Sequence, residues 1–496
     1  MMGTRQPQKE LFSYQVDLDH RVRTDHPLRK VTELIDFEFV RGEVKDQYGY
    51  NGNVSVDPAI IVKMMFLLFF EDVASERELM RIIPERLDWM WFLGYGLDDE
   101  IPDHSVLSKA RRRWGPTVFE ELFVRVVWQC VQMGLVGGEK IHMDGSLVDA
   151  NAANSAVLKG SPELIAQLRE QLQDEMAKLD EPAEEVPEGY YERKNKGLLN
   201  RTDPDAAMVR QGKGKPHARY KAHRVVDNRC GVITATETTA GDIKENAKLL
   251  DLVDQHQQNT ECAVKTVVAD SQYGTNENFR ACQGRGIRSH MADLQARHQN
   301  TGTRKDIFRP EDFVYDPQAD TYTCPAGQTL TRRKHKKKRE AYEYACSTAT
   351  CRDCPLRSQC TKAKGTARTI KRHYEQETID AARIESHSAA AKKDRRRRKW
   401  LMEGSFADSA NNHGFKRARW RRLWRQEIQD YLIATVQNVR TLIRQMGKQP
   451  RAAVAAVALD LLAARAFLGA RLRVPFRFLR SKQECSGMVN VLVAQR

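Results

Sequence analysis

Two short phrases, each running from β-forming residues into an aspartate, constrain the fold of this chain more than any other feature. The first is KIHMDGSLVDAN, which contains Asp144, and the second is VKTVVADSQYGTNENF, which contains Asp270. An aspartate after a β run lies near the carboxyl end of a strand, where side chains face a crevice instead of the core. Two such carboxylates on neighbouring strands supply the hard oxygen ligands that Mg²⁺ prefers. The sequence therefore predicts an α/β fold with a carboxylate-lined metal site.

A third carboxylate for that site is predicted at Glu403, within RRRRKWLMEGSFAD. It is a single acid among many cations, so it is either salt-bridged at the surface or retained for a metal. Glu385 and Glu427 are the rival candidates. Asp149 is a weaker ligand, because its odd offset along a regular strand turns it to the opposite face from Asp144.

The pattern around the aspartates predicts a sheet of mixed direction. β-forming runs alternate with helical runs, and Asn228 to Gly231 supplies the turn of a hairpin. We expect strands at 140–149, 218–227, 231–239, 264–270 and 287–292, and helices at 242–256 and 277–286. A polar insertion at 153–215 follows the first strand and is expected to be a helix plus a flexible loop.

The chain has 496 residues, too many for one ordinary domain. Changes in composition divide it into a helical N-terminal domain (1–135), the first part of the core (136–294), a cysteine-rich insertion (295–375), a helical C-terminal part of the core (376–447) and an Ala/Arg-rich tail (448–496). We therefore expect a mixed α/β core with an all-α N-terminal domain and a zinc-ribbon-like insertion.

The N-terminal domain contains a basic helix that is a candidate DNA reader. Apolar residues at helical spacing and the helix start at Asp57-Pro58 predict helices through most of 20–135. The segment PDHSVLSKARRRWGP resembles a helix-turn-helix in which Ser105 opens a helix. That helix carries Lys109, Arg111, Arg112 and Arg113. The alternative is that these cations form the solvated face of a helical dimerisation domain.

The net charge of +15 favours a polyanionic partner. Basic segments at 392–400 and 415–425 flank Glu403, which suggests phosphate contacts there, while a third basic run at 331–339 is expected to be an exposed loop. The cations proposed for DNA binding in the second segment are Lys416, Arg417 and Arg419.

No membrane segment is expected. The start of the chain is polar, and Asp460 and Arg465 interrupt its most apolar stretch, at 452–470. We therefore expect a cytoplasmic, nucleoid-associated protein.

Half of the ten cysteines lie between residues 324 and 360. Without an export signal, this grouping favours metal binding over disulfides. Four have the spacing C-x26-C-x2-C-x5-C, which suits a tetrahedral structural Zn²⁺, and they are Cys324, Cys351, Cys354 and Cys360. Cys346 is a spare that could replace one of them, and free or redox-active thiols are the alternative.

Taken in order, several phrases resemble bacterial insertion-sequence transposases of the DDE type, in the subgroup with a four-cysteine insertion ahead of the catalytic glutamate. They are DHPLRKV, SVDPAIIVKMMFLLFFEDVASERELMRII, HMDGSLVDANAANS, VVADSQYGTNEN, CPLRSQC, EGSFADSANNHGFKRARWRR and YLIATVQNVRTL. The resemblance covers roughly residues 20–445. It implies an RNase H-like core, a DNA-binding N-terminal domain and a catalytic triad of Asp144, Asp270 and Glu403.

The same resemblance implies a mechanism. Two Mg²⁺ or Mn²⁺ ions held by the triad activate water to nick DNA at the terminal inverted repeats of the element, which frees a 3′-OH. That hydroxyl attacks target DNA directly, without a covalent protein intermediate. Enzymes of this kind generally act as homodimers across two DNA ends.

The chain departs from the pattern at three places near the glutamate. Ala410 stands where many relatives have a lysine, and Arg396 and Lys399 stand where they have a tyrosine and an arginine. Lys416 or Arg417 could take over the phosphate contact. Two other functions therefore stay open, namely a catalytically inactive, zinc-stabilised DNA-binding protein and a structure-specific nuclease on the same fold.

Overall fold

The computed structural model describes residues 16–48, 55–179, 197–293, 306–337, 340–363 and 365–446. Its contacts divide the chain into a unit of Met1–Ile443 and a second unit that begins at Arg444. Apart from the end of the last helix, the elements named below lie in the first unit. The tail expected at 448–496 lies outside the described residues.

Short helices make up the N-terminal region, as the sequence predicts. They are α1 (Leu18–Arg21), α2 (Pro27–Leu34), α3 (Phe39–Val44), η1 (Lys45–Gln47), α4 (Pro58–Phe70), α5 (Glu76–Ile82), η2 (Ile83–Glu85), α6 (Leu87–Leu93), α7 (Ser105–Trp114) and α8 (Thr117–Gln132). Asp57 caps α4 by accepting a hydrogen bond from the amide of Ala59, and Pro58 fixes the first turn. The helix is apolar on nearly every side, so it forms the centre of this region's core.

The core of the chain contains a mixed sheet of the expected RNase H-like order. Its strands are β1 (Lys140–Asp149), β4 (Ala207–Val209), β5 (His217–Asp227), β6 (Ile233–Ala240), β7 (Thr266–Val268) and β8 (Arg288–Ser289). β1 lies between β5, which is antiparallel to it, and β7, which is parallel. β6 pairs antiparallel with β5, and β8 pairs parallel with β7. This arrangement confirms the predicted mixed α/β core.

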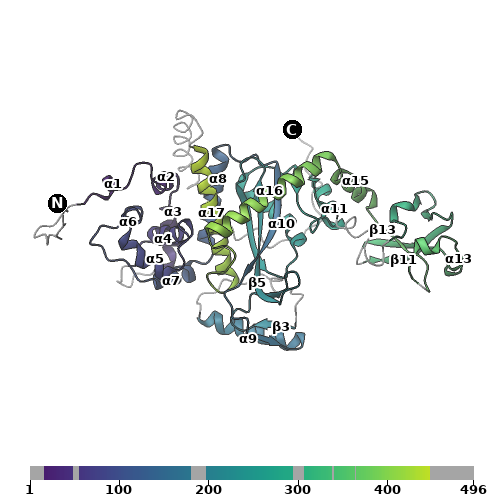
Figure 1. Ribbon diagram of the computed structural model, residues 1–496, viewed down its shortest axis with the longest axis horizontal. Coiled ribbons are helices and arrows are strands. Elements are labelled where there is room, and N and C mark those ends of the chain that lie inside the picture. Colours follow the sequence, from purple (N-terminus) through teal and green to yellow (C-terminus); the bar gives the residue numbers. More distant parts are fainter. Residues whose placement is uncertain are drawn as a thin grey trace, which may run out of the picture. The chain divides into compact units, whose positions relative to one another are not determined.

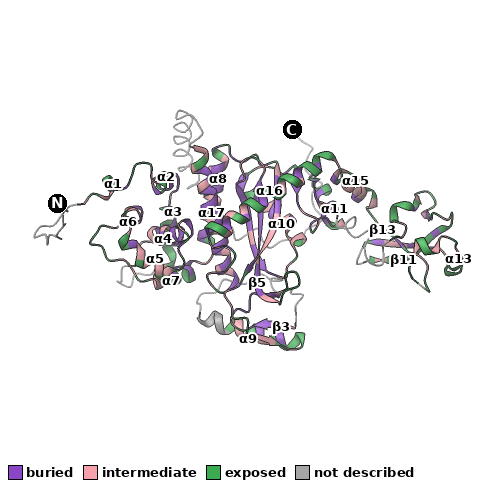
Figure 2. Cartoon of the chain, viewed as in Figure 1, coloured by how far each residue is buried: buried purple, intermediate pink, exposed green. Residues whose placement is uncertain are grey.

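Helices cover both faces of the sheet (Figure 1). On one face Ile141 and Met143 belong to an apolar cluster with residues of α10 and α11. On the other face α16 places Arg398 against Asp144. The sheet is largely buried, whereas α16 keeps an exposed outer side (Figure 2). The helices are η3 (Glu245–Lys248), α10 (Leu249–Thr260), α11 (Asn276–Gly284), α15 (Gln376–Ser386), α16 (Ala389–Asn412) and α17 (Leu423–Met446).

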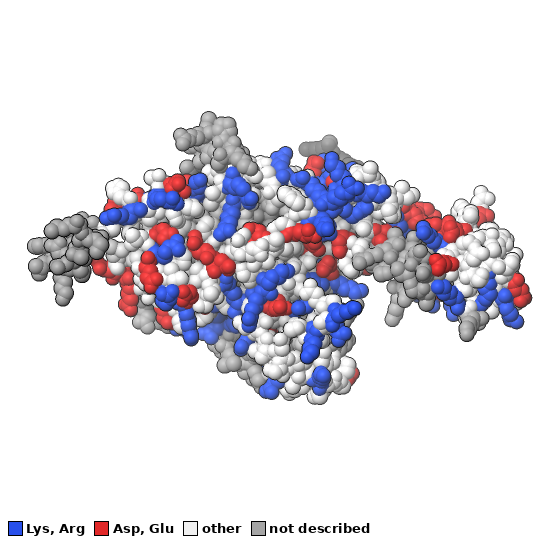
Figure 3. Space-filling view, viewed as in Figure 1, with Lys and Arg blue, Asp and Glu red and all other residues white. Residues whose placement is uncertain are grey.

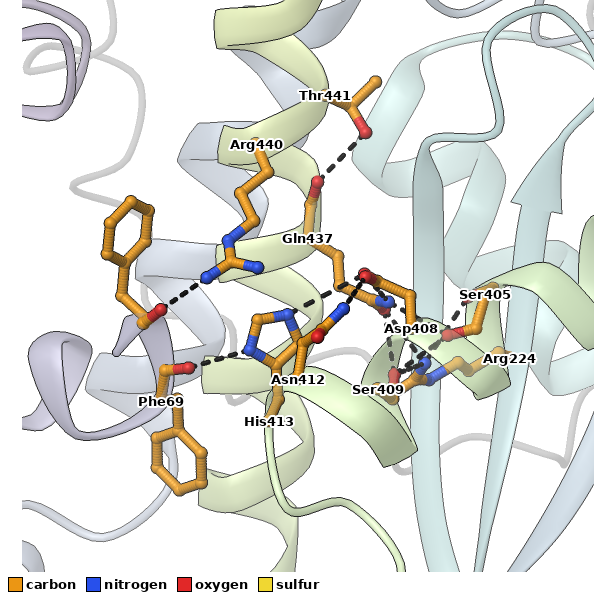
Figure 4. Close-up of polar contacts among 11 residues, drawn as sticks. Phe69, Arg224, Ser405, Asp408, Ser409, Asn412, His413, Gln437, Arg440 and Thr441 are labelled. Carbon is orange, nitrogen blue, oxygen red and sulfur yellow. Dashed lines mark hydrogen bonds and ion pairs between the residues drawn. The ribbon is translucent and has the colours of Figure 1, made fainter. Parts of the chain in front are cut away.

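Arg224 of β5 anchors the second half of α16. Its buried guanidinium donates to Ser409 Oγ at 2.7 Å and to Gln437 Oε1 at 3.1 Å. Gln437 Nε2 in turn donates to the carbonyl oxygen of Ser405 at 2.9 Å and to the carboxylate of Asp408. Figure 4 shows these side chains meeting between β5, α16 and α17. Core polar contacts therefore fix the position of α16 over the sheet.

Two insertions interrupt the core. The first contains the hairpin of β2 (Val157–Lys159) and β3 (Leu198–Asn200), and the helix α9 (Pro162–Leu179). The second contains a five-stranded antiparallel sheet of order β13-β12-β11-β10-β9. Its elements are η5 (Pro310–Asp312), β9 (Val314–Asp316), β10 (Thr321–Thr323), β11 (Thr329–Lys336), β12 (Ala341–Ala345), α13 (Thr348–Arg352), α14 (Arg357–Cys360) and β13 (Ile370–His373).

The basic run at 331–339 is largely part of strand β11, which corrects its prediction as an exposed loop. β11 pairs with β10 on one side and with β12 on the other. A strand can expose its cations when both neighbours satisfy its backbone hydrogen bonds. A run of basic residues is therefore not by itself evidence for a loop.

Candidate active site

The two predicted aspartates lie at the same level of the sheet. In the parallel pair of β1 and β7, His142 is opposite Val268. Two residues further along each segment, β1 reaches Asp144 and the turn after β7 reaches Asp270. Asp270 thus follows the carboxyl end of β7, and α/β sheets form a ligand-binding crevice at the carboxyl ends of their strands.

Asp144 is three-quarters buried and both of its oxygens accept hydrogen bonds. Oδ1 accepts from the amide of Gly145 at 2.9 Å, and Oδ2 accepts from Arg398 at 2.8 Å. The side chain of Asp144 is 25% exposed. Burial raises the pKa of Asp144, the charge of Arg398 lowers it, and the charge of Asp270 raises it. Asp270 accepts a hydrogen bond from the amide of Gln272 at 2.7 Å. Two carboxylates so close repel each other and gain from a shared cation.

Two cations reach the same face of β1. Arg398 contacts Asp144, and Lys416 Nζ donates to Ser146 Oγ at 2.8 Å. Because side chains alternate along a strand, Ser146 points to the same face as Asp144. Asp149, as predicted, lies on the other face, since the pairing of β1 with β5 runs without a shift, and Arg219 binds it at 2.6 Å.

Sequence reasoning missed two groups beside the aspartates. Glu245 packs against Gly145 so closely that a Cβ on this glycine would lie 2.9 Å from Glu245 Cγ. The hydroxyl of Tyr273 is fully buried and has no hydrogen-bond partner among the described residues. Gly145 is the feature of the sequence that could have indicated a neighbour such as Glu245, because a glycine inside a strand often marks the close approach of another group.

Glu403 lies apart from these groups. Its side chain is exposed on α16, and within the described part of the chain no hydrogen bond or ion pair holds it. At about 3.6 residues per turn, Glu403 lies about 140° around the helix from Arg398, which faces Asp144. Its rival Glu385 lies 3.8 Å from His290 Nε2.

The insertion brings five cysteines to one cavity. The four predicted zinc ligands and Cys346 line it together with apolar side chains such as Phe308 and Leu330. The Sγ atoms of Cys346 and Cys351 are 2.9 Å apart. Burial, together with the neighbouring Cys351, raises the pKa of Cys346 to about 12. Cys346 therefore belongs to the cluster as fully as the other four.

Neither cluster is arranged around an ion. Among the residues that the structure describes, no three His, Cys, Asp or Glu side chains are placed to hold a metal. On the sheet, Asp144 pairs with Arg398, and Glu245 lies 3.5 Å from Lys221 Nζ. The donors still fit a hard divalent cation, because carboxylate oxygens are its preferred ligands and a buried hydroxyl lacks a partner beside them.

The proposed DNA contacts separate into exposed and buried groups. Lys109, Arg112 and Arg113 are exposed on α7. Arg111, by contrast, is 2% exposed, pairs with Glu76 and stacks 3.9 Å from the ring centroid of Trp420. This corrects its prediction as a DNA contact, because its position on α7 faces the interior.

The second predicted group shows the same division. Lys416 and Arg417 are exposed, whereas Arg419 packs 4.7 Å from the ring centroid of Phe69 and pairs with Asp72 at 3.2 Å.

The first half of α16 presents a strongly basic surface. Figure 3 shows lysine and arginine side chains gathered over this part of the helix. Arg396 and Lys399 are exposed, and between them and Glu403 Trp400 is 73% exposed. A large exposed aromatic side chain among cations is typical of surfaces that bind nucleic acid.

None of the helices within the described ranges is long and apolar enough to cross a membrane.

Two family descriptions match the chain. Residues 16–113 match the family described as "Transposase domain (DUF772)", and residues 323–443 match the one described as "Transposase DDE domain". No curated protein matches the sequence. Among solved structures, the cryo-EM structure of the piggyBac transposase synaptic complex with hairpin DNA is 9% identical, with a TM-score of 0.37, and the match covers 91% of this chain and 82% of that one. With its two transposase domains in this order, the chain belongs to the insertion-sequence DDE transposases.

Proposed function

We propose that this transposase binds the terminal inverted repeats of its element and catalyses DNA cleavage and strand transfer at Asp144 and Asp270. The observation that carries the proposal is the level placement of these two aspartates at the end of β7, with Arg398 and Lys416 on the same face of β1. Phosphoryl transfer needs such a combination, with carboxylates for divalent cations and basic groups for the DNA backbone.

The two aspartates would hold Mg²⁺ or Mn²⁺, and ions bound there activate the attacking oxygen and stabilise the leaving one. Arg398 holds the Asp144 carboxylate in place through its hydrogen bond. Released from Asp144, its guanidinium is free to contact a DNA phosphate. Lys416, held beside Ser146, supplies a second positive charge to the same face.

Glu403 is included as the third carboxylate because of the resemblance to DDE transposases. In the described arrangement it points away from the aspartates, so its role requires a change in the phase or position of α16 when DNA is bound. Arg224 and Gln437 hold the second half of this helix. The residues that they hold begin at Ser405, so the change would have to affect the part of α16 before Ser405, which includes Glu403.

We also propose that α7 and the basic half of α16 contact DNA. Lys109, Arg112 and Arg113 are exposed on α7, and Lys416 and Arg417 follow α16. The protein would work as a homodimer that joins two ends of the element, as the family resemblance implies.

A structural Zn²⁺ in the insertion is the remaining part of the proposal. Cys324, Cys351, Cys354 and Cys360 line one cavity, and thiolates in such a group suit a tetrahedral zinc site. Cys346 lines the same cavity and competes for a ligand position. The zinc would fold the insertion and take no part in catalysis.

The test is a cleavage assay on a DNA fragment that carries the element's own ends, in Mn²⁺. Nicking that frees a 3′-OH, followed by joining of that end to a second DNA, supports a transposase. Nicking without joining supports the structure-specific nuclease, and binding without nicking supports the inactive DNA-binding protein.

A further inference from the structure

Glu245 reaches the backbone directly after Asp144. It begins η3, beyond strand β6, and its side chain lies against Gly145. A Cβ on Gly145 would meet Glu245 Cγ at 2.9 Å, Cδ at 3.0 Å and Oε1 at 3.1 Å. The glycine is therefore what lets this carboxylate approach the strand that carries Asp144.

Hydrogen bonds hold Glu245 in this place. Lys221 Nζ donates to the carbonyl oxygen of Ile243 at 2.9 Å and lies 3.5 Å from Glu245 Oε1. The buried amide of Asn278 donates to the carbonyl oxygens of Asn246, at 3.1 Å, and Tyr273, at 2.9 Å. Asn278 thus ties the turn that carries Glu245 to the turn that follows Asp270.

The Tyr273 hydroxyl supplies an independent sign of a missing ligand. The side chain is fully buried, and none of the residues that the structure describes accepts or donates a hydrogen bond at its hydroxyl. A buried polar group left without a partner destabilises a protein, so it usually has one in the working state. Burial raises the pKa of Tyr273 well above its usual value, and Glu245, Asp144 and Asp270 each raise it further, so the hydroxyl lies within their electrostatic reach.

Two of the three carboxylates in this region have a cation within ion-pair distance. Arg398 pairs with Asp144, and Lys221 lies beside Glu245. Burial raises the pKa of Glu245, and while Lys221 opposes this, Asp144 and Asp270 reinforce it. Asp144, Asp270 and Glu245 are therefore close enough to raise one another's cost of ionisation in one partly buried site.

We propose that Glu245 is a further carboxylate of the divalent-cation site formed by Asp144 and Asp270, and that the Tyr273 hydroxyl finds its missing partner in that site. The inference rests on the proposed function, because it adds a ligand to the same centre. Oxygen donors from strand β1, the turn after β7 and the start of η3 are the kind of ligands that a hard cation accepts. Binding exchanges the ion pairs with Arg398 and Lys221 for the cation.

The direct test is calorimetric titration of the full-length chain with Mn²⁺ alone. Glu245→Gln should weaken Mn²⁺ binding about tenfold or more, since it removes a charged ligand without removing volume. Glu237→Gln is the matched control, because Glu237 is a partly buried, lysine-paired glutamate on β6, with Lys248 Nζ at 2.6 Å. The proposal is overturned if Glu245→Gln binds Mn²⁺ like the wild type, or if both variants weaken it equally.

Asp144→Asn separates this inference from the proposed function. If Asp144→Asn abolishes Mn²⁺ binding and Glu245→Gln does not, only the role of Glu245 fails. If Asp144→Asn itself binds Mn²⁺ like the wild type, the proposed cation site fails as a whole. Glu245→Asp keeps the charge and should restore part of the affinity that Glu245→Gln loses.

Tyr273→Phe tests the hydroxyl without disturbing the fold. No hydrogen bond is lost in this variant, so its thermal unfolding without metal should match or exceed that of the wild type. Its Mn²⁺ affinity should fall several-fold, on the order of the effect of removing one hydrogen bond. Unchanged Mn²⁺ affinity would remove Tyr273 from the site.

Discussion

The carboxylate site on the central sheet and the cysteine cluster of the insertion are both candidate metal centres, yet they are built in opposite ways. Asp144 and Glu245 are ion-paired, and the exposed Lys416 lies on the same face of β1 as Asp144. The cysteines line a cavity with apolar neighbours, and burial raises the pKa of Cys346. The carboxylate site has charged side chains that a charged substrate can contact, whereas the cysteine cluster is surrounded by apolar side chains of the insertion. This difference separates a catalytic centre from a structural one.

The largest effect is expected from Asp144→Asn. Removing this charge should lower Mn²⁺-dependent nicking on the order of a thousandfold, because the reacting centre loses a metal ligand. Asp149→Asn is the matched control from the same strand, since Asp149 lies on the opposite face and pairs with Arg219. Gel analysis of nicked product measures both. An equal loss of nicking in the two variants would mean that any negative charge on β1 is needed, and that the position of Asp144 beside Asp270 is not.

Cys351→Ser tests the cysteine cluster of the insertion. Purified wild-type protein should contain about one zinc per chain, and the variant should lose it and expose the insertion to protease. Cys230→Ser, a change at a half-buried cysteine outside the insertion, should keep the metal. Atomic absorption and limited proteolysis report the result. Zinc-free wild-type protein with an intact insertion would contradict a structural zinc.

Asp430 shows what burial does to a carboxylate of this core without a metal. It is 1% exposed and accepts hydrogen bonds from Thr238 and Gln426. Burial raises its pKa to about 6, from the usual 3.8. Its contribution to stability is complete below about pH 4 and is lost as the pH rises through about 6, on the order of 3 kcal/mol.

Asp430→Asn should therefore flatten the fall in the free energy of unfolding between about pH 4 and pH 7. Asp408→Asn is the contrasting variant, because hydrogen bonds led by that of His413 lower the pKa of Asp408. Its contribution is present above about pH 4 and is lost as the pH falls below that, so this variant should flatten the acid side instead. Urea unfolding across the pH range measures both slopes. The same slope in both variants would refute these opposite assignments.

The smallest effect is expected on the basic surface of α16. Changing Arg396 and Lys399 together to glutamine should weaken DNA binding about tenfold and reduce the slope of log K against log salt by about 2. Arg81→Gln is a control on an exposed arginine that Glu78 already pairs at 2.7 Å. Fluorescence anisotropy at several salt concentrations gives both values. An unchanged salt slope would mean that these cations do not touch phosphate.

The sequence predicted the elements that bear the paired aspartates because their signals are local. A β run that leads into an aspartate predicts β1 and the turn after β7, although β1 continues past Asp144 to Asp149, and Ser105 marks the start of α7. Their pairing follows from the order of strands in an α/β sheet.

What the sequence could not predict depends on tertiary proximity. Glu245 reaches the site from another element, across Gly145, and no local pattern distinguishes it from an ordinary helix-start acid. The inward direction of Arg398 and the outward direction of Glu403 are set by the rotation of α16, which Arg224 fixes from β5. The burial of Arg111 likewise depends on Glu76 and Trp420, far away in the sequence.

Anomalous diffraction from crystals of the full chain soaked in Mn²⁺ tests the central claim most directly. The account predicts a manganese peak within about 2.0–2.3 Å of carboxylate oxygens of both Asp144 and Asp270, with the Arg398 ion pair opened. A peak elsewhere, with Asp144 still paired to Arg398, would contradict it.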